Sequence, residues 1–84
     1  MAEVRITPDA ASQLEALPPV IHSRVLKVLE RLRSWPTLCG VKPLRGRLAG
    51  SFRVRTGDYR VQFRVRSGGV IVERIGHRDR FYEN

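Results

Sequence analysis

The chain has 84 residues, 42% of them hydrophobic, and it carries 16 basic against eight acidic residues, a formal net charge of +8. A chain of this length has room for one domain, residues 1–84, and its hydrophobic content is too high for a disordered tail. Fourteen of the basic residues are arginine, whose planar guanidinium suits bidentate contacts with phosphate. The composition therefore argues against a multidomain protein and favours a polyanionic partner, above all nucleic acid.

The charge is concentrated in the second half of the chain. Residues 1–40 hold five basic and four acidic residues, whereas residues 41–84 hold eleven and four. The alternative to a nucleic-acid surface is a basic surface that only meets solvent. Cys39 is the only cysteine, so no internal disulfide can form, and we interpret it as a small buried side chain. This cysteine usage fits a reducing cytosol, and no apolar run is long enough to span a membrane, so we expect a cytoplasmic protein without a membrane partner.

The first half of the sequence predicts a strand followed by two helices. Residues 2–6 alternate polar and apolar side chains, as a short strand does. Thr7-Pro8-Asp9 provides a helix start, and the first helix is predicted over Pro8–Leu17. Pro18-Pro19 ends it and opens a second helix, which Pro36 stops. An apolar stripe along the second helix is wide enough to cover a sheet: Ile21, Val25, Val28, Leu29 and Leu32. The short link predicts a helical hairpin.

Three strands are predicted after an irregular connection over residues 37–50. They cover Ser51–Thr56, Tyr59–Arg66 and Val70–Ile75, separated by turns at Gly57-Asp58 and Ser67-Gly68-Gly69. The order is β-α-α-β-β-β, which indicates an α+β fold: an antiparallel sheet with the helical hairpin packed on one face. Period-two alternation then turns the apolar side chains inward. An open arginine face follows, formed by Arg53, Arg55, Arg60, Arg64 and Arg66, with no acidic residue alternating among them.

Three motifs in order give the sequence a resemblance to a known family. Leu44-Arg45-Gly46 precedes the first long strand, Phe52-Arg53-Val54-Arg55 leads into Gly57-Asp58-Tyr59-Arg60-Val61, and Gly76-His77-Arg78 opens an ending that runs to Phe81-Tyr82. This arrangement resembles the RelE/ParE family of bacterial type II toxins, and the likeness extends over nearly the whole chain. The short helical hairpin and the intact ending are more similar to the RelE branch.

The resemblance implies a function and its partners. RelE-type toxins enter the ribosomal A site and cleave the exposed mRNA, so the expected activity is a ribosome-dependent endoribonuclease that inhibits translation. The expected partners are the ribosome, mRNA and a cognate antitoxin that covers the basic face. Two alternatives stay open: a DNA gyrase inhibitor of the ParE kind, and a non-catalytic RNA-binding relative.

The resemblance also assigns candidate site residues. Arg60 and Arg78 match the family's functional arginines and are expected to contact phosphate. Arg53 and Arg55 stand where RelE has catalytic lysines, and because a guanidinium stays protonated they can clamp phosphate but not act as the base. The base or acid must then be His77 or Tyr82. We expect arginines around His77 to favour its neutral form, and the alternatives are an exposed loop histidine and a tyrosine packed on the sheet.

The remaining basic residues near the sheet are secondary candidates for RNA binding. They could equally be solvated, and they are Lys42, Arg45, Arg47, Arg64 and Arg80. No cluster of His, Cys, Asp and Glu has the spacing of a metal site, so we expect metal-independent chemistry without a cofactor.

Overall fold

A computed structural model describes residues 2–79 of the 84. The elements in chain order are β1 (Val4–Ile6), α1 (Pro8–Glu15), α2 (Pro19–Leu32), β2 (Val41–Pro43), the 3-10 helix η1 (Gly46–Leu48), β3 (Ser51–Thr56), β4 (Tyr59–Arg66) and β5 (Gly69–His77). The predicted β3 and β4 match the structure residue for residue. The two helices occur where they were expected, but α2 ends at Leu32 and residues 33–36 form a turn, so the helix stops before Pro36 is reached.

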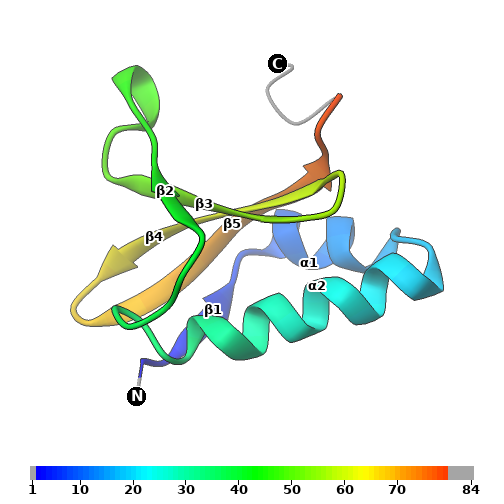
Figure 1. Cartoon of the computed structure of the whole chain (residues 1–84), viewed down its shortest axis with the longest axis horizontal. Helices are drawn as coiled ribbons and strands as arrows, with labels where there is room; N and C mark the ends of the chain where they lie inside the picture. Colours follow the sequence, from blue (N-terminus) through cyan, green and yellow to red (C-terminus); the bar gives the residue numbers. More distant parts are fainter. Residues whose placement is uncertain (1, 80–84) are drawn as a thin grey trace.

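The strands form one sheet in the order β1-β5-β4-β3-β2, and both helices lie on one face of it (Figure 1). The neighbours from β5 to β2 are antiparallel. The prediction of a wholly antiparallel sheet is wrong at one edge, because β1 runs parallel to β5, with Val4 opposite Val70 and Ile6 opposite Val72. Alternation along residues 2–6 predicts a strand but gives neither its partner nor its direction.

The core lies between the helices and the inner face of the sheet. The predicted stripe of α2 supplies Val25, Val28, Leu29 and Leu32, all buried, while Ile21 is partly buried at its end. The strands supply the buried Val54, Val61, Phe63, Val70, Val72 and Ile75. An aromatic cluster closes one end, with the Trp35 ring 4.9 Å from that of Phe52 and 5.5 Å from that of Phe63. This packing holds the sheet rigid beneath the opposite face.

Local sequence sets the ends of the helices. The Thr7 hydroxyl accepts a hydrogen bond from the Ala10 N–H at 3.1 Å, and Pro8 stands at the first helical position. This is the N-cap arrangement that the sequence predicted. The helix α1 ends at Glu15, two residues before its predicted end at Leu17, because a residue that precedes proline is disfavoured in helical conformation.

Two side chains cover the part of the β5 edge that the short β1 leaves open. The Thr7 hydroxyl donates to the Glu73 carbonyl at 3.4 Å, and the Gln13 side-chain oxygen accepts from the Ile75 N–H at 2.7 Å. An uncovered strand edge exposes polar backbone groups. These two bonds therefore tie α1 to the strand that ends at His77.

The connection over residues 37–50 is more regular than expected. It contains η1 and the edge strand β2, whose Val41, Lys42 and Pro43 pair with Val54, Arg53 and Phe52. A three-residue strand that contains proline gives no alternation to detect, and it is defined only by its pairing with β3. Within residues 2–79, no helix is long and apolar enough to cross a membrane.

Candidate nucleic-acid interface

The sheet face opposite the helices, called here the outer face, gathers the predicted arginines. In an antiparallel pair, directly opposed residues turn their side chains to the same side. Arg55 is opposite Arg60, Ser51 is opposite Arg64, and one row crosses four strands. That row consists of Lys42, Arg53, Gln62 and Arg74. The register thus brings Arg53, Arg55, Arg60 and Arg64 onto one face, as predicted, and adds Lys42 and Arg74 to them.

An acidic residue lies among these arginines, contrary to the expectation of a face without one. The Glu73 carboxylate accepts hydrogen bonds from the Ser51 hydroxyl at 2.8 Å and from the Gln62 side-chain nitrogen at 3.3 Å, and it lies 3.4 Å from Arg64. An irregularity between β4 and β5 pairs Arg74 with Gln62 but Val72 with Phe63, so Glu73 is the extra residue of a bulge. Glu73 follows the inward-facing Val72 and so faces outward, and the bulge lets the next residue, Arg74, reach the outer face as well.

Four arginines converge on a hollow of about 600 Å3 at the end of the sheet where β3 turns into β4, called here the arginine hollow. It is lined by Arg31, Arg55, Arg60 and Arg78, with Cys39, Gly40, Val54, Gly57 and Asp58. Among the lining residues, Asp58 is the one carboxylate. A concentration of positive charge inside a concave surface raises the local concentration of anions. The hollow is therefore the part of the molecule best suited to hold a phosphate group.

The β3–β4 turn fixes the position of Arg78. The Arg78 N–H donates to the Asp58 carbonyl at 2.7 Å, and the Arg78 guanidinium lies 3.8 Å from the Asp58 carboxylate and 3.7 Å from that of Asp79. Exposed ion pairs of this length contribute little stability. The backbone bond is what holds the segment after β5 against the turn, and Arg78 lines the arginine hollow together with Arg60.

His77 lies at the end of β5 and does not line the arginine hollow. It pairs with Tyr59, and the two rings meet edge to face with centroids 5.2 Å apart. The expectation of an arginine environment is wrong, because the charged group beside its Nδ1 is the Asp79 carboxylate at 3.5 Å. Since Nδ1 accepts a hydrogen bond from the Asp79 N–H at 3.1 Å, the neutral ring carries its proton on Nε2. In this neutral state Nε2 donates a hydrogen bond and does not accept one, whereas donation of a proton requires the imidazolium, which carries a proton on both nitrogens.

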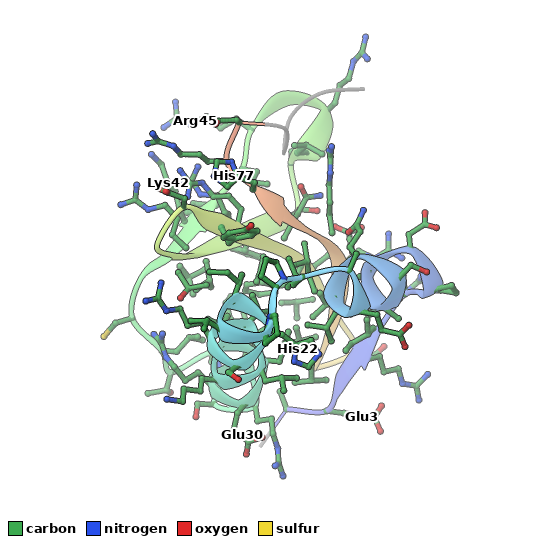
Figure 2. All side chains as sticks on the ribbon, turned by 90° about the vertical axis from the view of Figure 1, so that its right-hand side faces the viewer. Glu3, His22, Glu30, Lys42, Arg45 and His77 are labelled. Atoms are coloured by element: carbon green, nitrogen blue, oxygen red, sulfur yellow. The ribbon has the colours of Figure 1, made fainter. Side chains whose placement is uncertain are left out.

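The secondary candidates lie beside the outer face. Lys42 and Arg45 line a separate hollow with Pro43 and Leu44, and Arg47 is exposed in η1. In Figure 2, Lys42 and Arg45 lie on the side of the sheet away from α2, whereas His22 and Glu30 lie on the helical side. Arg80 and Tyr82 lie outside the described residues.

Sequence reasoning missed three residues of the arginine hollow. Arg31 comes from α2, and its guanidinium donates to the Cys39 carbonyl at 3.1 Å, so it lies close to the chain that leaves the helix. Cys39 is exposed rather than buried. From the sequence, the preference of aspartate for turns is enough to explain Asp58, so it was not a candidate for the site. Only Asp58 carried a local signal, its place inside the motif that also holds Arg60.

Within residues 2–79, no group of three His, Cys, Asp or Glu side chains is arranged to hold a metal ion. The hollow offers guanidinium groups, the carboxylate of Asp58 and the thiol of Cys39. The imidazole of His77 lies outside the lining, at the end of β5.

The fold of a helical hairpin on one face of a mixed sheet is shared with the solved toxins named below. The model of the ParE toxin family of type II toxin–antitoxin systems matches residues 4–82. Toxin RelG of Mycobacterium tuberculosis is 37% identical over 81 residues, which cover 94% of this chain and 93% of RelG. The chain therefore belongs to the ParE toxin family, within the RelE/ParE superfamily of type II toxins.

Solved structures agree with this assignment. A chain in the crystal structure of the toxin–antitoxin complex RelBE2 from M. tuberculosis is 38% identical, with a TM-score of 0.81 over 92% of this chain and 98% of that chain. A chain in the archaeal RelE–RelB complex from Pyrococcus horikoshii is 26% identical, with a TM-score of 0.77 over 94% and 97% of the two chains. The likeness extends over nearly the full length of each chain.

Proposed function

We propose that this toxin is an mRNA endoribonuclease that acts on the ribosome and stops translation, in the cytoplasm. The arginine hollow is the observation that carries the proposal. Arg55, Arg60 and Arg78 converge there from β3, β4 and the segment after β5. Transfer of the phosphoryl group from the 5′-oxygen to the 2′-oxygen builds negative charge on the phosphate oxygens, and fixed guanidinium groups stabilise that charge.

The outer face supplies the RNA-binding surface of this proposal. Arg53 and Arg64 lie on it beside Lys42, and Arg45, Arg47 and Arg80 extend the set along the chain. Each phosphate that such residues neutralise adds affinity without sequence preference. A ribosome that holds the mRNA in place would contribute the alignment of the reacting atoms, which such a shallow site supplies weakly by itself.

The chemical roles follow from the side chains. Arg60 and Arg78 contact the scissile phosphate, and Arg53 and Arg55 add positive charge but take up no proton. His77 is assigned, in its imidazolium form, to proton donation from Nε2 toward the leaving 5′-oxygen, with the Asp79 carboxylate 3.5 Å from the other ring nitrogen, Nδ1. Tyr82 remains a candidate for stacking on a base. Neither a metal nor an organic cofactor has a step in this scheme.

The partner that controls the toxin is a cognate antitoxin. The solved relatives named above are complexes of a toxin with its antitoxin. Covering the arginine hollow with an acidic segment would block access to phosphate, because one surface cannot hold both polyanions at once.

The experiment is primer extension on a defined mRNA after incubation with programmed ribosomes and purified toxin, beside the Arg60→Ala variant. Ribosome-dependent cuts by the unaltered protein and at least about a hundredfold loss in the variant are expected, a magnitude typical for a group that stabilises the developing charge. A gyrase supercoiling assay forms the second arm. Inhibited supercoiling with intact mRNA would replace the proposal by a ParE-like function, and salt-sensitive RNA binding without cuts would replace it by a non-catalytic one.

A further inference from the structure

Cleavage of RNA by its own 2′-hydroxyl needs a group that takes the hydroxyl proton, and this inference rests on the proposed function above. The arginines cannot serve, because a guanidinium stays protonated and has no acceptor. The acceptor must lie next to the phosphate-binding groups, since a base works within about 3 Å of the proton that it removes. The proton acceptor should therefore be a side chain at the arginine hollow.

The observed contacts make three side chains near the hollow poor candidates for the acceptor of the 2′-hydroxyl proton. Glu73 is fully engaged, with bonds from Ser51 and Gln62 and a contact to Arg64, its side chain is 23% exposed, and it does not line the hollow. His77 also lies outside the lining, and its unprotonated nitrogen accepts from the Asp79 N–H. Cys39 lines the hollow, but the sulfur of a thiol is a weak hydrogen-bond acceptor.

Asp58 meets each requirement that the others fail. It lines the hollow beside Arg55, Arg60 and Arg78, and its side chain is 64% exposed. The turn that holds it is anchored by the 2.7 Å bond from the Arg78 N–H to the Asp58 carbonyl. The 3.8 Å contact with Arg78 leaves the carboxylate oxygens available to a third group. An ionised carboxylate carries only acceptors, so its natural partner is a hydroxyl.

We propose that the Asp58 carboxylate accepts the proton of the attacking 2′-hydroxyl. The proton moves from the 2′-oxygen to Asp58 while the 2′-oxygen forms a bond to phosphorus. The bond from phosphorus to the 5′-oxygen then breaks, and the 5′-oxygen takes a proton from Nε2 of the His77 imidazolium, which later regains one from solvent, or from water. The products are a 2′,3′-cyclic phosphate and a 5′-hydroxyl, and Asp58 later returns its proton to solvent.

The structure provides a matched control for this proposal. Asp58 and Asp79 lie at nearly equal distances from the Arg78 Nε, 3.8 and 3.7 Å, and both are exposed. Asp58→Asn and Asp79→Asn each remove one negative charge and one ion pair with Arg78, and Asp79→Asn also removes the carboxylate beside His77 Nδ1 while it keeps the backbone N–H there. Only Asp58 lines the hollow. Asparagine also favours turns, so the Asp58→Asn variant is expected to keep the β3–β4 turn.

The experiment measures single-turnover cleavage on programmed ribosomes, together with binding of a short RNA by each variant. Asp58→Asn is expected to slow cleavage by at least about a hundredfold, as for loss of a general base, with equal or tighter RNA binding. Asp79→Asn is expected to stay within about fivefold of the unaltered protein, as for loss of an exposed ion pair. Asp58→Glu, which keeps a carboxylate, is expected to recover at least about tenfold over Asp58→Asn.

Two outcomes overturn the role of Asp58 alone. One is cleavage by Asp58→Asn within about fivefold of the unaltered protein. The other is an equal loss in both asparagine variants, which would trace the effect to the contacts with Arg78 and His77 and away from a proton acceptor at Asp58. An unaltered protein that leaves mRNA intact would instead overturn the proposed function, and the proton step with it, so the two failures are distinguishable.

Discussion

Replacing Arg60 by alanine tests whether the arginine hollow binds phosphate. Four arginines line it, and each phosphate contact to single-stranded nucleic acid contributes about −0.7 to the slope of log K against log salt concentration. If each hollow arginine neutralises one phosphate, the four contacts contribute about −2.8 to the slope, a roughly 50-fold fall in affinity between about 50 and about 200 mM salt on top of that from the outer face. With three contacts left, the contribution of the hollow in Arg60→Ala should be only a roughly 18-fold fall over the same range.

The assay is fluorescence anisotropy of a labelled single-stranded RNA, titrated with protein at several salt concentrations. The matched control is Arg33→Ala, because Arg33 pairs with Glu30 at 3.0 Å at the end of α2 and does not line the hollow. That variant should keep the slope of the unaltered protein. An unchanged slope in Arg60→Ala, or an equal reduction in Arg33→Ala, would refute the reasoning, since the affinity would then not depend on where the charge lies.

Three further predictions concern the scaffold and the proton-donor role proposed for His77. Gln13→Leu removes the acceptor of the Ile75 N–H and should lower the free energy of unfolding, measured by urea titration, by about 1–3 kcal/mol. Gln13→Glu keeps an acceptor, so an equal loss of stability in both variants would contradict this prediction. Glu73→Ala leaves the buried Ser51 and Gln62 donors without their acceptor and should also lower the free energy of unfolding by about 1–3 kcal/mol. An unchanged midpoint of the urea unfolding transition would show that the bulge needs no carboxylate. His77→Ala should slow cleavage by at least about a hundredfold without changing the salt slope of RNA binding, and an unaltered rate would identify His77 as a surface residue.

The fold could be predicted wherever side-chain alternation is regular. Phe52 to Arg55 and Tyr59 to Arg66 alternate strictly around Gly57-Asp58, and both strands have the predicted bounds. The last strand runs past its predicted end at Ile75, to His77. Its alternation fails because Glu73 is the extra residue of a bulge, which depends on the partner strand and not on the local sequence.

The site could be predicted as a face but not as a hollow. Alternation alone places Arg53, Arg55, Arg60 and Arg64 on one side of a sheet. The hollow also needs Arg31 from α2 and the chain at Cys39, and the position of these segments depends on how the helix packs. The surroundings of His77 were mispredicted for a similar reason, since its contact with Tyr59 depends on the β4–β5 register, and the carboxylate beside it comes from Asp79.

The most direct test of the account is the dependence of cleavage on an empty ribosomal A site. Primer extension would compare free mRNA, ribosomes with a vacant A site, and ribosomes whose A site is filled with tRNA before the toxin is added. Cuts at the A-site codon are expected only when the A site is vacant, and the upstream RNA fragment should end in a 2′,3′-cyclic phosphate. Equal cutting of free mRNA, or intact mRNA in all three samples, would contradict the account.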